Sequence, residues 1–172
     1  MFLGIDLGTG SVKALLLDAD GRVVSEASSS YPVHAPHPNW AETHPDEWWQ
    51  ATVKAVREAV GQHDVKAIGL SGQMHGTVLV DKNLNVLRPA ILWADTRSQK
   101  QLEHYRHLSK TQRQCLANPI ATGMTGVSLL WLKENESDIY KQTRWILQPK
   151  DWIRLKLTGK VHAEPSDASA TL

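Results

Sequence analysis

The stretch Gly4–Asp18, GIDLGTGSVKALLLD, decides the fold because it places two apolar segments on either side of a tight bend. The first segment, Phe2–Asp6, is typical of a strand that ends in an acid. The second, Ser11–Asp18, is nearly all apolar, which predicts a strand covered on both faces. Small residues fill the bend Gly8–Gly10 between them. A carboxylate beside such a bend raises the question of what it binds.

The next part of the chain predicts an antiparallel meander joined to a parallel strand. The segment DADG, Asp18–Gly21, is a hairpin turn with glycine where a positive φ is needed, and Arg22–Ser30 is a third strand. An extended segment rich in proline and histidine, Tyr31–Pro45, leads to a helix, and Val65–Ser71 is a fourth strand. A strand–helix–strand order gives parallel pairing through a right-handed crossover. We therefore expect an α/β domain with a mixed sheet flanked by helices.

The helix before the fourth strand carries clear start and stop signals. Thr43 or His44 can cap it, Pro45 suits its first turn, and Gly61 is expected to end it. Four apolar residues recur at helical spacing and predict the face turned to the core: Trp49, Val53, Val56 and Val60.

The remaining chain predicts a hairpin and then mostly helices. The expected elements are a hairpin over Thr77–Trp93, a polar helix over Asp95–Leu108, a helix over Ser128–Asn135, a strand over Arg144–Pro149 and a helix ended by Gly159.

Composition excludes several classes of protein. The 172 residues carry a formal net charge of +1, so neither nucleic acid nor a charged membrane surface is an expected partner. The one cysteine, Cys115, can form no internal disulfide. The start of the chain lacks the pattern of a signal peptide, and no stretch approaches the roughly 20 apolar residues of a membrane span. We expect a cytoplasmic protein.

The bend after the first strand predicts a phosphate site. Backbone N–H groups of Gly8, Thr9 and Gly10 would point outward without side chains in the way, and such a concavity binds anions. Thr9 and Ser11 add hydroxyl donors, and Lys13 adds a cation nearby.

The acid Asp6 fits this interpretation only if a cation accompanies the phosphate. A carboxylate repels phosphate, whereas Mg²⁺ binds a carboxylate, waters and phosphate oxygens together. The alternative is a plain β-hairpin in which Asp6 caps the turn, since short glycine motifs occur often without a ligand.

A second polar bend, GQMHG at Gly72–Gly76, follows the fourth strand, where open α/β sheets bind ligands. Gln73 and His75 offer groups that hydrogen-bond sugar hydroxyls, while Met74 and Trp93 offer apolar surfaces for sugar C–H groups. The alternative for His75 is an ordinary surface histidine.

Two further groups of polar residues have plainer interpretations. Asp95 and Arg97 in WADTR either cap a helix and pair with each other or contact the sugar. Three histidines lack the spacing of metal ligands on any one element and are expected to be solvated: His34, His37 and His44.

Several stretches together resemble a known family. GIDLGTGSVKALLLD is similar to the phosphate hairpin of the actin, Hsp70 and sugar kinase superfamily, which has a ribonuclease H-like fold. The segments PHPNWAETHPDEWWQA, IGLSGQMHGTVLVD, LRPAILWADTR, LQPKDWIRLKLTG and SDASATL resemble the FGGY carbohydrate kinases, in the family's order and over essentially the whole chain. GQMHG is similar to D-xylulose kinases, whereas glycerol kinases carry an arginine–glutamate pair at this place.

The resemblance implies roles for the matched residues. Asp6 corresponds to the acid that helps hold the Mg²⁺ of MgATP. The implied nucleotide contacts are the phosphate loop and an approaching cation: Gly8, Thr9, Gly10, Ser11 and Lys13. The implied sugar contacts are a matched pair and an aromatic wall: Met74, His75 and Trp93. The implied reaction converts ATP and D-xylulose to ADP and D-xylulose 5-phosphate.

The resemblance also implies that residues 1–172 form only the amino-terminal part of the first of two domains. The family's general base, an aspartate that takes the proton from the sugar hydroxyl, would lie beyond Leu172. We therefore expect the chain alone to be inactive, with an exposed sheet edge that favours a homo-oligomer or modest stability.

Two other functions were weighed. A non-catalytic module that binds sugar or phosphate would need no general base. A ribonuclease H-like nuclease would need clustered carboxylates for two metal ions, and none follows Val65–Ser71.

Overall fold

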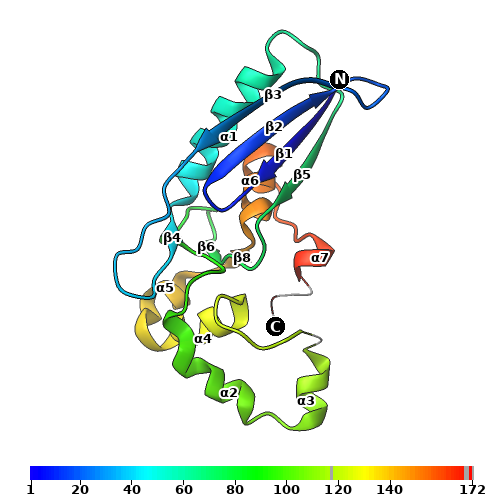
Figure 1. Cartoon of the computed structure of the whole chain (residues 1–172). Helices are drawn as coiled ribbons and strands as arrows, with labels where there is room; N and C mark the ends of the chain where they lie inside the picture. Colours follow the sequence, from blue (N-terminus) through cyan, green and yellow to red (C-terminus); the bar gives the residue numbers. More distant parts are fainter. Residues whose placement is uncertain (117, 169–170, 172) are drawn as a thin grey trace.

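The computed structural model describes residues 1–116, 118–168 and 171, and its central element is a four-stranded sheet of order β3-β2-β1-β5 (Figure 1). The strands are β1 (Phe2–Leu7), β2 (Ser11–Leu17), β3 (Val23–Ser30) and β5 (Ala67–Gly72). β1 pairs antiparallel with β2 and parallel with β5, and β2 pairs antiparallel with β3. The expected meander and parallel fourth strand are confirmed.

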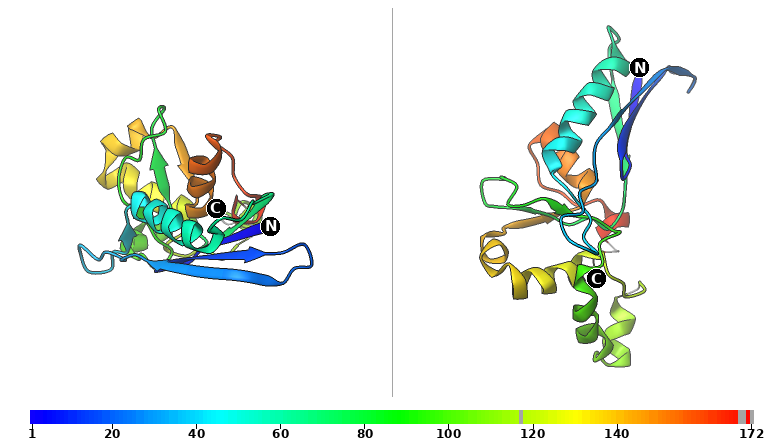
Figure 2. Two further views of the ribbon diagram at one scale, coloured as in Figure 1. Left: turned by 90° about the horizontal axis from the view of Figure 1, so that it is seen from above. Right: turned by 60° about the vertical axis from the view of Figure 1, so that its left-hand side comes forward.

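The helices lie on one face of this sheet. Figure 2 shows α1 (Pro45–Val60) and α6 (Pro149–Thr158) on the same side, with the opposite face bare. In β2 the alternate residues Val12, Ala14 and Leu16 are fully buried, whereas Leu15 and Leu17 are half-buried. The prediction that this strand is covered on both faces was wrong, because no described element lies over the second face.

Helix α1 begins and ends as predicted but turns a different face inward. The Asp46 N–H donates to Nδ1 of the N-cap His44, and the Gly61 N–H donates to a carbonyl of the last turn. The buried residues are Pro45, Trp48, Ala51, Thr52, Ala55 and Ala59. Of the predicted set, Trp49, Val56 and Val60 are only partly buried and pack against the edge of the core. The alanines let the helix approach the sheet closely, and the larger valines flank this contact.

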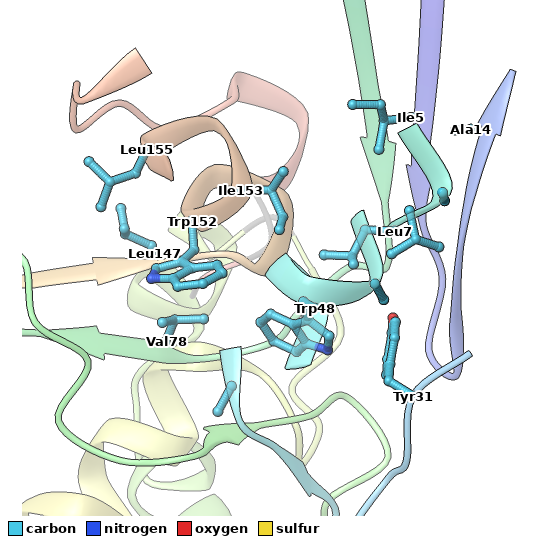
Figure 3. Packing of buried hydrophobic residues seen from close by; sticks show 14 of the residues in the cluster. Ile5, Leu7, Ala14, Tyr31, Trp48, Val78, Leu147, Trp152, Ile153 and Leu155 are labelled. Carbon is cyan, nitrogen blue, oxygen red and sulfur yellow. The ribbon is translucent and has the colours of Figure 1, made fainter. Parts of the chain in front are cut away.

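The core lies between the sheet, α1 and α6. Figure 3 shows Trp48 of α1 facing Trp152 of α6, and their rings meet edge to face with centroids 6.4 Å apart. Leu7 and Tyr31 lie on the sheet side of the same cluster, which places the end of β1 directly over the core. Burial of aromatic surface on this scale holds both helices against the strands.

Two small sheets extend the molecule beyond the main sheet. The first pairs β4 (Glu42–Thr43) with β7 (Ala90–Ile91), and the second pairs β6 (Val78–Val80) with β8 (Trp145–Leu147). The predicted hairpin is present, since Val80 bridges Val86 and Thr77 bridges Ile91.

Short helices form the lower part of Figure 1. The predicted helix over Asp95–Leu108 is divided into a 3₁₀ segment, Arg97–Gln101, and α2 (Leu102–Arg106), with a non-helical backbone at Ser98. The other helices are α3 (Lys110–Cys115), α4 (Thr125–Asn135), α5 (Ser137–Gln142) and α7 (Pro165–Ala168). Within the described residues no helix has the length and apolar character to cross a bilayer. Part of the SDASATL stretch, residues 169, 170 and 172, lies outside the described residues.

Candidate functional site

The bend between β1 and β2 is held in place by neighbouring segments. The Gly8 N–H donates to the Ser11 carbonyl at 2.9 Å, which closes the turn. The Gly8 carbonyl accepts from Nε2 of Gln73 at 3.3 Å and from the hydroxyl of Tyr31. The Gly10 carbonyl accepts from the backbone N–H of Tyr31 at 3.1 Å. The carbonyls of the bend are therefore tied inward.

The amides of the same bend are left for another partner. Within the described part of the chain, the N–H groups of Thr9 and Gly10 donate no hydrogen bond. Gly10 is exposed, and a Cβ added to it would meet no atom within 4 Å. Two unpaired amides in a bend of small residues have the character of an anion site.

Tyr31, at the end of β3, is a residue of this bend that the sequence analysis missed. Figure 3 shows its ring in the core with the hydroxyl turned towards Leu7, and this hydroxyl donates to the carbonyl of the next residue, Gly8. Burial, together with the nearby negative charge of Asp6, raises the pKa of Tyr31 well above its ordinary value. The hydroxyl therefore remains a proton donor to the Gly8 carbonyl throughout the range in which proteins work.

Asp6 lies one residue before the end of β1, on the bare face of the sheet. It lies opposite Lys13 of β2 and Ser71 of β5 in the strand register, and it is exposed. No hydrogen bond or ion pair from the described residues occupies its carboxylate, whereas the Lys13 ammonium lies 3.7 Å from a Glu26 carboxylate oxygen. A free carboxylate next to an anion site fits hydrated Mg²⁺, which uses one or two protein carboxylates and several waters.

The loop Gly72–Gly76 continues from β5 alongside this bend. The Gln73 N–H donates to the Leu7 carbonyl at 2.7 Å, so the β1–β5 pairing runs into the loop. A Cβ added to Gly76 would lie 2.4 Å from Cγ of Pro149, so glycine alone fits against the first turn of α6. The loop is thus fixed between β1 and α6.

Two polar atoms of this loop are buried without a partner. Oε1 of Gln73 and Nδ1 of His75 form no hydrogen bond with any described group. His75 also has a φ of +63°, a left-handed backbone that non-glycine residues seldom adopt. Unpaired buried atoms and backbone strain concentrate where a ligand completes the structure.

Trp93 contacts the bend from a third segment. Its Nε1 donates to Oγ1 of Thr9 at 3.0 Å, although half of the residue is exposed. Gly123, with a φ of +79°, lies against the Trp93 backbone, where an added Cβ would be 2.1 Å from the carbonyl oxygen. Met74 is also exposed, and no hydrogen bond of the described residues joins His75 to Trp93.

The model of one family matches the whole of this chain. That family is the FGGY family of carbohydrate kinases, N-terminal domain, over residues 1–172. The chain belongs to the FGGY family of carbohydrate kinases. A xylulose kinase of Klebsiella pneumoniae is 43% identical over the full chain, and that of Escherichia coli strain K12 is 42% identical.

Solved structures agree with the family. A xyloylose kinase from Brucella ovis superposes with a TM-score of 0.94 and 40% identity, covering 98% of this chain and 36% of that structure. The fold is therefore the ribonuclease H-like fold shared by actin, Hsp70 and sugar kinases, as the sequence resemblance predicts. The FGGY chain spans 36% of the length of the Klebsiella and Escherichia relatives.

In this FGGY chain, Asp95 and Arg97 form a buried ion pair, one of the two arrangements predicted for them. The Asp95 carboxylate accepts the Ala41 N–H at 2.7 Å and Nη2 of Arg97 at 2.7 Å. Both side chains are 1% exposed. Since Asp95 lies two residues after Trp93, this pair anchors the segment that carries the exposed indole.

The pair belongs to a longer buried ion network, which comprises Glu42, Arg88, Asp95, Arg97 and Glu136. Arg97 lies 2.7 Å from Glu42, which also meets Arg88, and Arg88 lies 3.1 Å from Glu136. Burial lowers the pKa of Arg88, while the carboxylates of Glu42 and Glu136 act in the opposite direction. The Arg97 guanidinium also stacks on Trp40, 3.5 Å from the ring centroid.

A second charge cluster, which the sequence analysis assigned no role, joins α6 to α7. The Lys150 ammonium lies 2.9 Å from carboxylate oxygens of both Glu164 and Asp167. The Cβ of Lys150 would lie 3.3 Å from a Cβ added to Gly72, so the two backbones are close together. The cluster therefore supports the start of the loop from behind.

The three histidines of Tyr31–Pro45 have ordinary structural roles. His34 bonds Glu47 at 3.0 Å, His37 packs against Trp40, and His44 caps α1. No group of three metal-ligating side chains forms among the residues that the structure describes.

Proposed function

We propose that this chain is the amino-terminal part of the first domain of an ATP-dependent carbohydrate kinase. In this proposal it carries the phosphate hairpin and part of the sugar site. The observation that carries the proposal is the bend Gly8–Gly10, whose amides are free on one side. On the other side, Gln73 joins it to the loop that holds His75, and Trp93 contacts it from a third segment.

The nucleotide side uses the bend and the end of β1. The N–H groups of Thr9 and Gly10 and the hydroxyl of Ser11 would donate to phosphate oxygens, and Asp6 would hold Mg²⁺. Lys13 shares the bare face of the sheet with Asp6 and adds positive charge there. Bound Mg²⁺ neutralises the charge that develops on the phosphates during transfer.

The sugar side uses the loop after β5 and the Trp93 indole. His75 and Gln73 have unpaired polar atoms that match hydroxyl groups, and Met74 and Trp93 offer exposed apolar surface. We assign a pentulose, with D-xylulose first, because relatives named xylulose kinase share 43% and 42% of the residues.

In the complete reaction the sugar hydroxyl oxygen attacks the γ-phosphorus, the bond to the ADP oxygen breaks, and a general base takes the hydroxyl proton. We place that base in the part of the relatives that this chain does not span. The 172 residues then bind both ligands without transferring phosphate. A second candidate is a non-catalytic module that binds sugar or phosphate, and it uses the same free amides and unpaired polar atoms.

Binding measurements on two variants test the two sides separately. Calorimetry with D-xylulose and with MgADP should show that His75→Ala weakens sugar binding and leaves MgADP binding alone. Asp6→Asn should weaken MgADP binding and leave the sugar alone. An equal loss of both ligands in either variant would contradict the assignment.

A complementation assay separates the kinase from the binding module. The chain is mixed with the carboxyl-terminal remainder of the Klebsiella relative, and ADP release is followed with D-xylulose and with D-ribulose. Sugar-dependent ADP release supports the kinase. Binding of both ligands without any release supports the module.

A further inference from the structure

The proposed nucleotide and sugar sides are joined by two side-chain hydrogen bonds. Gln73 reaches from the loop to the Gly8 carbonyl, and Trp93 reaches from beyond β7 to the Thr9 hydroxyl. The sequence predicts that Gln73 and Trp93 contact only the sugar. In the structure, each donates an N–H group to the phosphate bend.

We propose that Gln73 and Trp93 are positioning residues that couple the two sides, so that each ligand binds more tightly when the other is present. This inference rests on the proposed function and adds to it a defined route of coupling. Such coupling is a difference in binding free energy and is reciprocal by thermodynamic necessity.

The Trp93 contact sets the orientation of the Thr9 hydroxyl. A hydroxyl has one proton and two lone pairs, and here one lone pair accepts the indole N–H at 3.0 Å. The proton of Thr9 is then directed away from the indole and is free to donate to a phosphate oxygen. A sugar that packs on the exposed half of the Trp93 ring fixes the indole, and this fixes the hydroxyl.

The Gln73 amide offers a second route. Its Nε2 donates to the Gly8 carbonyl at 3.3 Å, a long bond, while its Oε1 is buried without a partner. A sugar hydroxyl that donates to Oε1 polarises the amide and strengthens the bond from Nε2, because linked hydrogen bonds reinforce one another. The bend is then held more firmly in the shape that presents its free amides.

The backbones of both donors are fixed, so movement is confined to their side chains. Gln73 is part of the β1–β5 hydrogen-bond pattern through Leu7. The Trp93 segment is clamped between Gly123 and the Asp95–Ala41 contact. A change at one end of either side chain is therefore transmitted to the other end rather than absorbed by the loop.

Calorimetry on the 172-residue chain tests the coupling with MgADP and D-xylulose as probes. Each ligand should bind about fivefold more tightly in the presence of the other, the lower end of typical coupling. Trp93→Phe keeps an aromatic ring but removes the N–H donor, and Thr9→Val removes the acceptor at constant shape. Each should lower the ratio of affinities to the part carried by Gln73, and the double variant should lower it no further.

Two control variants separate coupling from affinity. Thr9→Ser retains the acceptor oxygen and should retain the ratio, whereas His75→Ala should weaken sugar binding and also retain the ratio. The indole N–H signal of Trp93, identified by its loss in Trp93→Phe, should shift when MgADP is added alone.

Each result supports or overturns the inference. If both ligands bind independently in the unaltered chain, the coupling is wrong and the proposed function stands. If neither ligand binds alone or together, the proposed function fails and the coupling fails with it. If Trp93→Phe and Thr9→Val bind both ligands with the ratio intact, these residues do not carry the coupling.

Discussion

The candidate site and the buried ion network lie close together, and they differ in how their polar groups are paired. The candidate site leaves amides of the bend, Oε1 of Gln73 and Nδ1 of His75 without partners among the described residues. In the ion network each carboxylate meets a guanidinium group at short range. Arg88 and Arg97 also keep nitrogen atoms without a hydrogen-bond partner, but each of these charges faces an opposite charge, so the second region has the properties of a scaffold. The unpaired groups of the first region face no such charge and have the properties of a ligand site.

One segment serves both regions. Trp93 is exposed and contacts the bend, and Asp95, two residues on, is buried in the network. The ion pairs of the network thus hold in place the segment that carries Trp93, which contacts the bend of the candidate site. Four experiments test this difference between the two regions.

The largest effect is expected from breaking the network. Arg97→Met leaves the buried Asp95 carboxylate without its main partner and removes one of the two partners of Glu42, so we expect a loss of about 3–5 kcal/mol in unfolding free energy. Urea denaturation measures it. The matched control is Arg106→Met, because Arg106 pairs with Glu103 at the surface and should lose at most about 1 kcal/mol. Similar small losses in both variants would show that the network is not a scaffold.

A smaller effect is expected where the loop packs on α6. Gly76→Ala would place a methyl group against Pro149, and overpacking of this kind costs about 1–3 kcal/mol. Gly69→Ala is the control, since an added Cβ there meets nothing within 4 Å. Thermal unfolding of the two variants should differ clearly. Equal midpoints would mean that the loop moves away from α6 easily.

The strained backbone of His75 gives a test inside the site itself. His75→Gly and His75→Ala both remove the imidazole, but only glycine accepts a φ of +63° freely. His75→Gly should therefore be more stable than His75→Ala by about 1 kcal/mol. Denaturation midpoints of the two variants decide this, and an alanine variant as stable as the glycine variant would argue against strain at this position.

The smallest effect is expected from the charge cluster behind the loop. Hydrogen bonds from Ser166, and then from Lys150, lower the pKa of Glu164 from 4.5 to about 2. The Glu164 carboxylate therefore takes up a proton less readily in the folded chain than in the unfolded chain. Its contribution to stability is complete above pH 4.5 and is lost as the pH falls towards 2. Burial raises the pKa of Asp151, which acts with the opposite sign.

Circular dichroism across this pH range should show a shallower decline in Glu164→Gln than in the unaltered chain. Because Glu164 is largely at the surface, the difference will be modest. Identical pH profiles would remove Lys150 and Glu164 from the set of contacts that support the loop.

Local signals in the sequence predicted most of the fold. The bend after β1, the cap at His44 and the stop at Gly159 depend on residues near one another in the chain, and all three are present. The prediction for the inward face of α1 was wrong because it followed the spacing of the valines. The alanines form the buried face, since their small side chains permit close packing.

The candidate site divides in the same way. Sequence patterns identified Asp6, the bend and the loop, whose roles remain predictions. They gave no sign of the Tyr31 hydroxyl on Gly8 or of the Gln73 and Trp93 bonds to the bend, because these contacts join residues far apart in the chain. A tyrosine directly after a strand, followed by proline, was the one available signal for Tyr31.

The position of β5 at the end of the strand order has a practical consequence. Among the residues that the structure describes, no strand pairs with its outer edge, and Ile68 is 48% exposed. Such an edge can accept a strand from another molecule, so we expect self-association to rise steeply with protein concentration. The same strand ends in the loop Gly72–Gly76. The loop conformation should therefore be studied at concentrations that keep the chain monomeric. In associated chains, a neighbouring molecule can impose another conformation on it.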